Sequence, residues 1–342
     1  MARRPTIADI AREAGVSKGA VSYALNGQPG VSESTRQRIL RISASLGYAP
    51  NSAARTLAGA RVGAVGLVLC RPASILGVEP FFMELISGIS GELSARSTGL
   101  TLQVAPDHET ELAIYERWWR SRQVDGVLLT DVRQEDRRLD AVRRMQLPAV
   151  AIAGPGPFPG IPAVWSDDAA AVREAVGYLA ALGHRRIARI AGPDDLLHTR
   201  VRTAAFEEAC RERGISHSFT VTTDYTGPDG SRATRRVLSM APAPTALLYD
   251  NDIMAVAGLA VATEMGIAVP AELSLVAWDD SILCTLVHPA LTALSRDIPD
   301  YGAAAARTLL GVLDGAEPDD VQHGTPHLIT RGSTARPETR RG

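Results

Sequence analysis

Lysine is nearly absent from this sequence. Of its 36 basic residues, Lys18 is the only lysine and all the others are arginine. Arginine presents a planar fork of donors, whereas lysine is a compact and flexible point donor. A chain that keeps a single lysine, and keeps it near the N-terminus, suggests that this position needs the thinner donor. The alternative is that Lys18 is an ordinary exposed residue.

Cysteine is also scarce. Cys70, Cys210 and Cys284 are widely separated and form neither a C-x-x-C pair nor a Cys/His pattern with metal-ligand spacing. This excludes a disulfide scaffold and a zinc finger. We interpret the three as structural thiols in a reducing compartment, and we expect no metal and no cofactor.

Long apolar runs are missing as well. No segment has the roughly 18 consecutive apolar residues that a membrane span needs, and the first residues do not read as an export signal. The composition, 45% hydrophobic and 22% charged, is that of a globular protein. At 342 residues the chain is long enough for two or three folded units. We expect a cytoplasmic, nucleoid-associated protein that contacts no membrane.

Charge is distributed unevenly along the chain. Residues 1–60 hold eight basic and three acidic residues, a net charge of +5, whereas the other 282 residues carry −7. A basic head on an acidic body favours a nucleic-acid contact at the head. Charge alone leaves open that the imbalance is accidental, because arginine-rich sequences produce such clusters.

The first 49 residues predict three short helices. Apolar residues at helical spacing mark the first, and Thr6 followed by Asp9 resembles a capping box. Gly15 ends this helix, and Ser17 and Ser32 can cap the two that follow. Two helices joined by a glycine-containing turn form a helix-turn-helix, whose second helix enters the major groove of DNA.

The outer side of that second helix is small or polar. The small residues at positions 19–20 let it lie deep in the groove. Lys18 can donate to guanine O6 and N7, Tyr23 can reach a base edge or a phosphate, and Ser22 and Asn26 suit phosphates. We therefore predict that Lys18 contacts a base.

A linker of residues 50–61 follows. Pro50 ends the third helix, and the next residues predict a helix that is marginal alone, because isolated helices below about 12 residues are unstable. Leu57 is then an exposed apolar residue on a linker. We expect the segment to fold on DNA and Leu57 to enter the minor groove between base pairs. The alternative is that Leu57 packs on the domain behind it.

These motifs together carry a family resemblance. TIADIAREAGVSKGAVSYALNG (6–27), VSESTRQRILRISASLGYAPNSAARTLAG (31–59), ALGHRRIARIAGP (181–193), YDNDIMAVAGLAVATEMGIAVPAELSLVAWDDS (249–281) and HPALTAL (288–294) resemble the LacI/GalR family of bacterial repressors. The resemblance covers nearly the whole chain. It implies a homodimer that binds a pseudo-palindromic double-stranded operator and responds to a small effector, usually a sugar or a nucleobase. It also implies that the two hinge helices lie in the minor groove, each inserting a leucine that matches Leu57.

The candidate DNA-contacting residues are all in the head and the linker. They are Thr6, Ser17, Lys18, Gly19, Ala20, Ser22, Tyr23, Asn26, Ser32, Thr35, Tyr48, Asn51, Ala54 and Leu57.

The sequence after residue 61 predicts an α/β body. Short apolar runs at 64–69, 99–105, 125–130, 148–153, 186–192, 245–250 and 273–278 alternate with helical stretches such as 79–97, 168–184 and 200–214. Strands alternating with helices indicate parallel sheets, and so many units suggest two.

The resemblance makes this body similar to periplasmic binding proteins, with two lobes joined by three chain crossings. We expect the fold to divide into a helix-turn-helix domain (1–49), a hinge helix (50–61) and an effector-binding and dimerisation domain (62–342). Its first lobe is expected at about 62–162 plus 294–323, and its second at about 163–293 plus 324–342. The crossings are expected at 161–163, 292–295 and 322–326. No leucine heptad follows residue 330, so a dimer is expected rather than a tetramer.

Ligands of such folds bind at the carboxyl ends of the strands. Asp279 and Asn251 directly follow predicted strands and Arg202 lies near the start of a predicted helix, so their acceptors and donors suit a polyol or a nucleobase. By resemblance these three match the family's main effector contacts. Phe81, Phe82 and Tyr225 match aromatic contacts, and Leu196 and His198 lie in a variable loop. One phenylalanine of the pair is expected to be buried.

One departure concerns the segment after the run 148–153. Many sugar-binding members have an aspartate there that binds hydroxyl groups, whereas this chain has Ala153-Gly154-Pro155-Gly156. The departure weakens a simple monosaccharide assignment. Trp165 nearby could supply a stacking face or belong to the core between the lobes.

We expect an effector-controlled transcriptional repressor, with a sugar as the effector, and no enzyme. An effector-independent DNA binder is the main alternative. A cytoplasmic sugar-cleaving enzyme is less favoured, because no second placed carboxylate, nucleophile elbow or P-loop is evident. A transport solute-binding protein would need an export signal and would not need the head.

Overall fold

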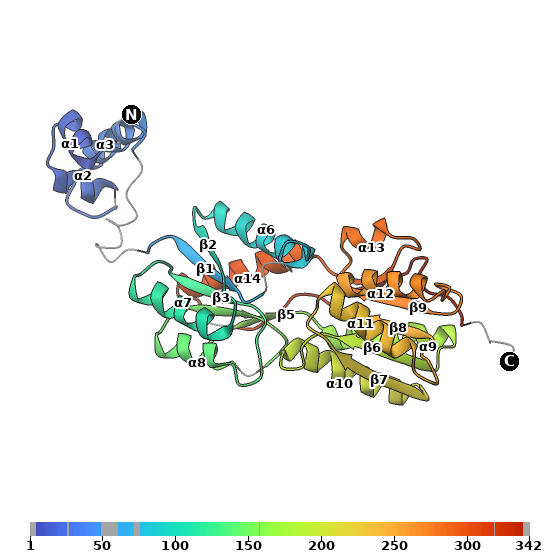
Figure 1. Ribbon diagram of the computed structural model, residues 1–342. Coiled ribbons are helices and arrows are strands. Elements are labelled where there is room, and N and C mark those ends of the chain that lie inside the picture. The colour runs from blue at the N-terminus through green and yellow to red at the C-terminus, as the bar shows by residue number, and fades with distance from the viewer. Residues whose placement is uncertain are drawn as a thin grey trace. The chain divides into compact units, whose positions relative to one another are not determined.

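A computed structural model describes residues 5–25, 27–48, 61–71, 76–156, 158–317 and 319–337 (Figure 1). The chain divides into two compact units, residues 1–62 and 63–342. No helix of the described residues is long and apolar enough to cross a membrane.

The head contains α1 (Ile7–Ala14), α2 (Lys18–Leu25) and α3 (Glu33–Ser45), as predicted. The predicted caps are present. The backbone N–H and the hydroxyl of Thr6 both donate to the Asp9 carboxylate, at 2.9 and 2.6 Å, and the Ser17 hydroxyl accepts from the backbone of Ala20 at 3.1 Å. Gly15 ends α1 in the left-handed conformation that glycine adopts without strain. The core consists of Ile10, Ala11, Ala14, Val21, Ala24 and Ile39.

The body consists of two six-stranded sheets, each in its own lobe. In spatial order the first sheet contains β11 (Val321–Gln322), β5 (Ala163–Trp165), β4 (Ala149–Ile152), β3 (Gly126–Leu129), β1 (Ala64–Leu69) and β2 (Gly99–Val104), all parallel. The second contains β12 (His327–Ile329), β10 (Thr292–Ser295), β9 (Ser274–Trp278), β8 (Ala246–Tyr249), β6 (Arg186–Ala191) and β7 (His217–Thr222). Only β12 is antiparallel to its neighbour among these described strands. The predicted α/β class and all seven predicted strands are confirmed.

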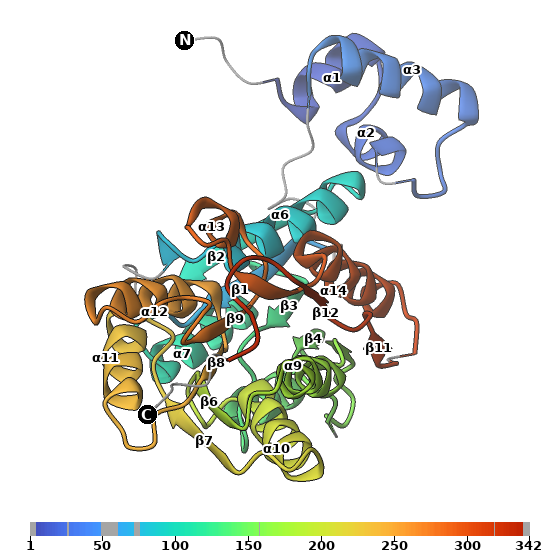
Figure 2. The same ribbon diagram turned by 90° about the vertical axis from the view of Figure 1, so that its right-hand side faces the viewer.

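Helices cover both faces of each sheet, because alternate strand residues point to opposite faces. In the first lobe α6 (Pro80–Ala95) and α14 (Ile298–Leu313) cover one face, and α7 (His108–Arg120) and α8 (Arg137–Arg144) cover the other. In the second lobe α11 (Gly227–Leu238) and α12 (Asp252–Glu264) lie opposite α9 (Asp168–Leu182) and α10 (Leu197–Glu212). The two lobes and their helix layers are also visible in Figure 2.

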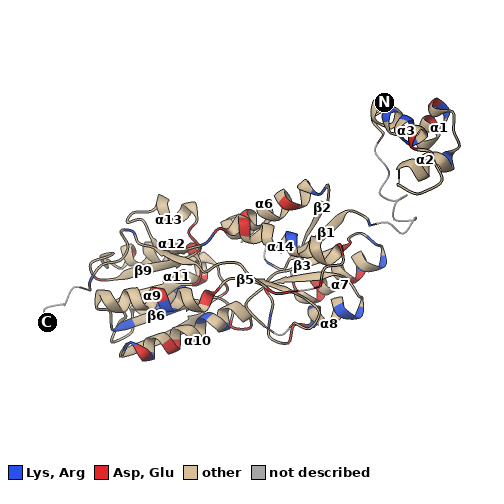
Figure 3. Cartoon of the chain, turned by 180° about the vertical axis from the view of Figure 1, so that it is seen from behind, with Lys and Arg blue, Asp and Glu red and all other residues tan. Residues whose placement is uncertain are grey.

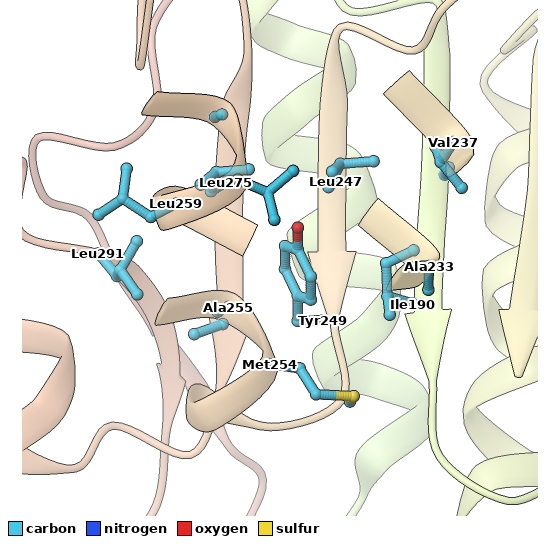
Figure 4. Packing of buried hydrophobic residues seen from close by; sticks show 14 of the residues in the cluster. Ile190, Ala233, Val237, Leu247, Tyr249, Met254, Ala255, Leu259, Leu275 and Leu291 are labelled. Atoms are coloured by element: carbon cyan, nitrogen blue, oxygen red, sulfur yellow. The ribbon is translucent and has the colours of Figure 1, made fainter. Parts of the chain in front are cut away.

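The second lobe's packing follows from this alternation. Ile190, Leu247, Tyr249 and Leu275 point from the sheet toward α11 and α12 (Figure 4), whereas their strand neighbours point toward α9 and α10. The Tyr249 hydroxyl, buried in this layer, is hydrogen-bonded to Thr234 at 2.8 Å. Six of the seven apolar runs are therefore strands buried on both faces, which is typical of parallel sheets, whereas the run 99–105 forms the partly exposed edge strand β2.

The chain crosses between the lobes after β5, after β10 and between β11 and β12. The first two crossings lie a few residues beyond the positions expected from the sequence, because Ala163–Trp165 still pairs with β4 and Thr292–Ser295 still pairs with β9. The first lobe therefore continues through Trp165, and the second lobe continues through Ser295.

Candidate functional site

The second head helix exposes the side chains that the sequence singled out. Lys18 and Gly19 at its start are exposed, and Tyr23 is 47% exposed, whereas Val21 and Ala24 face the core. Thr6, Ser17 and Ser32 are also exposed, and each hydroxyl is engaged at a helix start. The structure thus places a lysine, a glycine and a tyrosine on the open side of α2. Asn26, Asn51, Ala54 and Leu57 lie outside the described residues, so their predicted contacts stay predictions.

The second site is an open cavity at the carboxyl ends of the strands of both sheets. Seven of the eight predicted effector contacts line it. They are Phe81, Phe82, His198, Arg202, Tyr225, Asn251 and Asp279. The first sheet adds Arg71 after β1 and Asp131 after β3, and the chain crossings add Ser166, Asp168 and Arg296.

Arg202 connects two parts of this cavity. It is buried, its Nε donates to Asp168 at 2.8 Å, and its guanidinium lies 3.7 Å from the centre of the Trp278 ring. Arg202 and Arg296 hold the pKa of the buried Asp168 below its usual range, against the opposing effect of burial. Asp168 therefore stays ionised, and Arg202 is fixed at the cavity wall.

Asp279 is held by a second arginine. Arg296, which lies just after β10, donates to Asp279 Oδ1 at 3.2 Å and to the Ser166 hydroxyl at 3.0 Å. Burial raises the pKa of Asp279, and Arg296 opposes that shift. A third pair, Arg71 with Asp131 at 2.9 Å, lies on the first lobe. The sequence carries no local signal for Asp168, Arg296 or this third pair, because each interaction joins segments that are distant in the chain.

Asn251 and Tyr225 have structural roles in addition to their place in the wall. Asn251 caps α12, with its Oδ1 accepting from the backbone of Met254 at 2.9 Å, and its Nδ2 donates to the backbone carbonyl of Tyr225 at 3.0 Å. The Tyr225 hydroxyl is 2.8 Å from His198 Nε2. Burial lowers the pKa of His198 to about 4, so this imidazole is neutral at physiological pH.

Three residues of the cavity wall have a strained backbone. Asp131, Tyr225 and Asp279 have φ of 50°, 69° and 59°, in the left-handed region that non-glycine residues rarely adopt. Such strain is typical of binding sites, where it fixes side-chain direction. Tyr225 also needs a glycine beside it, because a Cβ at Gly192 would lie 2.0 Å from its ring.

Three sequence interpretations are settled by burial. Phe82 is buried and Phe81 half-buried, as expected for a pair facing different ways, although both line the cavity. Leu196 was predicted to contact the effector, and this is wrong. It is 1% exposed in the second-lobe core, while its backbone bridges to Arg133 of the first lobe. Trp165 packs in the first-lobe core rather than at the cavity.

Two further observations differ from the sequence interpretation. Several carboxylates line the cavity, where no second one was evident. Cys70, His108 and Glu111, which show no metal-ligand spacing in the sequence, have potential ligand atoms within 4.8 Å of one another. Glu111 is already engaged there, because its carboxylate binds Arg138 at 2.6 Å, the Tyr115 hydroxyl at 3.0 Å and His108 Nδ1 at 3.1 Å.

Comparison with known proteins identifies the architecture. Residues 6–51 match the bacterial regulatory proteins of the lacI family, and residues 176–334 match the periplasmic binding protein-like domain. The HTH-type transcriptional regulator CelR of Thermobifida fusca is 32% identical over 97% of this chain and 98% of its own length. The chain belongs to the LacI family.

Two solved structures of this family have the same fold. A LacI family transcriptional regulator from Bifidobacterium animalis subsp. lactis is 38% identical, with a TM-score of 0.75 over 82% of this chain and all of its own. A complex of the transcriptional regulator CelR with cellobiose is 30% identical, with a TM-score of 0.74 over 96% of this chain and all of its own. The chain is therefore a DNA-binding transcriptional regulator with a LacI-type head and a periplasmic-binding-protein-like body.

Proposed function

We propose that this regulator is a repressor whose operator affinity is controlled by a neutral saccharide bound between the two lobes. The observation that carries the proposal is the cavity itself, where Arg202, Arg296 and Asp279 present donors and acceptors beside Phe81 and Phe82. Polar groups of this kind bind hydroxyls, and aromatic faces pack against the apolar faces of sugar rings. The cellobiose bound by the related CelR supports the same ligand class.

The arrangement fits a binding site better than a glycosidase. A glycosidase needs one carboxyl group that is a free acid and another that is a free base or nucleophile. Asp131, Asp168, Asp250 and Asp279 are each paired with an arginine, which leaves Glu79 as the one unpaired carboxyl among the described lining residues and no second one to act with it. We therefore infer that the cavity binds its ligand and does not cleave it.

We further propose that the regulator acts as a homodimer through one face of the body. Large apolar side chains are exposed there, with Met83 on α6 at 61% and Ile282 and Leu286 on α13 (Ile282–Leu286) at 63% and 73%. The two helices lie on the same side of the body in Figures 1 and 2, and α13 carries no charge (Figure 3). Exposed apolar residues of this kind favour burial against a second copy.

Changing Ile282 and Leu286 together to aspartate is expected to convert the dimer to monomers. Burying two carboxylates at an apolar interface costs several kcal/mol, which raises the dissociation constant at least about 100-fold. Analytical ultracentrifugation measures this change. Trp119→Asp on α7 is the matched control, since Trp119 is also exposed but lies on the opposite face of the first sheet. Equal dissociation by both variants would contradict the assigned face.

Lys18→Ala is expected to weaken binding to the selected operator by about 1–3 kcal/mol and to relax the preference at one base pair. Lys18→Arg tests whether the site needs the thinner donor, and should also weaken binding. Arg41→Ala, at an exposed residue of α3, is the control for loss of one positive charge. Binding profiles against a library of operator variants measure the effect. An unchanged base preference would remove Lys18 from the base contacts.

The proposal is tested by selecting bound sequences from a random duplex pool, with and without a panel of neutral saccharides. An enriched pseudo-palindrome whose recovery falls with one saccharide is the expected result. A palindrome that no saccharide affects would support the effector-independent alternative.

A further inference from the structure

One carboxylate in the cavity differs from all the others. Glu79, the residue directly before α6, lines the cavity but is only 7% exposed. Its Oε2 is buried and has no hydrogen-bond partner. A buried acceptor without a partner is costly, so such a group in a native structure needs an explanation.

The remaining acidic residues of the cavity wall are each paired. Asp131 binds Arg71, Asp168 binds Arg202, Asp279 binds Arg296, and Asp250 binds Arg189. Among the described residues that line the cavity, Glu79 is thus the acid that forms no ion pair. The wall after β4 offers no alternative acceptor side chain, because Ala153, Gly154 and Pro155 line it.

We propose that Glu79 is the carboxylate that accepts the hydroxyl groups of the saccharide effector, and that effector binding at this residue is coupled to release of a proton. This inference rests on the proposed saccharide effector. A carboxylate can accept two hydroxyl groups at once, and such charge-assisted hydrogen bonds are about twice as strong as neutral ones. The ligand therefore supplies the partner that the unliganded protein lacks.

Glu79 shares its cavity with three arginines and two phenylalanines. Arg71, Arg202 and Arg296 line the same cavity, and Arg71 and Arg296 lie over the Phe82 and Phe81 rings at 5.7 and 5.2 Å. Each of these guanidinium groups is already paired with an aspartate, so their charges do not decide between a neutral and a cationic ligand. A neutral ring can pack on Phe81, the half-buried member of the pair, while its hydroxyls reach Glu79.

Charged groups on four elements face Glu79 and, together with its burial, determine its pKa. Burial raises its pKa to about 7, and Asp131 after β3, Asp279 after β9 and Asp252 at the start of α12 add to that shift. Arg71 after β1 opposes it. Hydroxyl groups that donate to Glu79 bind its ionised form, so a protonated Glu79 must first lose its proton. Effector affinity is thus expected to rise about tenfold between pH 6 and pH 8.

The test is calorimetric titration of the full-length protein with cellobiose, maltose and glucosamine at pH 6 and pH 8. We expect a neutral disaccharide to bind the native protein about tenfold more tightly at pH 8. Glu79→Gln should lower that affinity at pH 8 at least tenfold and remove the pH dependence. Glu84→Gln, on the same helix but not in the cavity wall, should behave like the native protein.

Thermal unfolding without ligand tests the role of Glu79 independently of the identity of the effector. Because Oε2 of an ionised Glu79 has no partner, Glu79→Gln should raise the melting temperature at pH 8 by roughly 5 °C and leave it nearly unchanged at pH 4, where the carboxyl is largely protonated in both the folded and the unfolded protein. Equal disaccharide affinity in the native and Glu79→Gln proteins would overturn the role of Glu79 alone. Binding of glucosamine only, or of none of the three compounds, would overturn the neutral-saccharide effector together with it.

Discussion

Asp279→Asn is expected to abolish the effector response while leaving operator binding intact. Asp279 is nearly buried, its left-handed backbone points it at the cavity, and Arg296 holds its carboxylate. Asparagine adopts the same backbone conformation with little strain, so the fold is retained. Loss of charge-assisted hydrogen bonds to the effector, each worth about 1.5–3 kcal/mol, lowers effector affinity roughly 10- to 100-fold.

Calorimetric titration measures the effector affinity of the variant. An operator-binding assay in the absence of effector measures whether its operator affinity is retained. Asp280→Asn is the matched control, because the neighbouring Asp280 pairs with Arg331 at 2.7 Å and does not line the cavity. A normal effector response in Asp279→Asn would remove Asp279 from the site. A defect in both variants would point to the loop rather than to the contact.

Arg189→Leu is expected to have the largest effect on stability. Arg189 and Asp250 are both fully buried, and two hydrogen bonds of 2.8 and 2.5 Å join them. Arg189 also donates to the Thr203 hydroxyl at 2.7 Å. Removing the arginine leaves an uncompensated carboxylate in the core of the second lobe, which costs about 3–5 kcal/mol of the free energy of unfolding.

Urea unfolding at pH 7 measures this loss. The double variant Arg189→Leu/Asp250→Asn is the informative comparison, since removing the buried charge as well should restore a large part of the stability. It should still bind its effector poorly, because Asp250 lines the cavity. A loss below about 1 kcal/mol in the single variant would show that the pair is not the core element proposed here.

Arg189 also illustrates what the sequence can and cannot predict. The run RIARIAG was predicted as a buried strand, and it is one, because its alternate residues fill two apolar layers. The sequence does not show that its second arginine is buried, since the partner, Asp250, lies 61 residues away. Strands and helix caps depend on neighbouring residues, and their patterns are therefore visible in the sequence.

In the cavity, too, some residues could be predicted from the sequence and others could not. Asn251 and Asp279 are predicted because strand ends in a parallel sheet meet at one edge, and all of Arg202, Asn251 and Asp279 are predicted by the family resemblance. Glu79 was missed because it belongs to no motif and matters only through the absence of a partner in the folded protein. The prediction for Leu196 was wrong because a position in a loop between strand and helix does not determine whether the side chain points to the cavity or to the core.

We infer that the cavity and the DNA-binding head are coupled. Coupling between two binding sites is reciprocal, so an effector that weakens operator binding must itself bind less tightly to the operator complex, by the same factor. The most direct measurement is calorimetric titration of the selected saccharide into the protein, with and without saturating operator duplex. We predict that the operator lowers the affinity for the saccharide by the same factor by which the saccharide lowers the affinity for the operator. Identical saccharide affinity in the presence and absence of the operator would contradict the account.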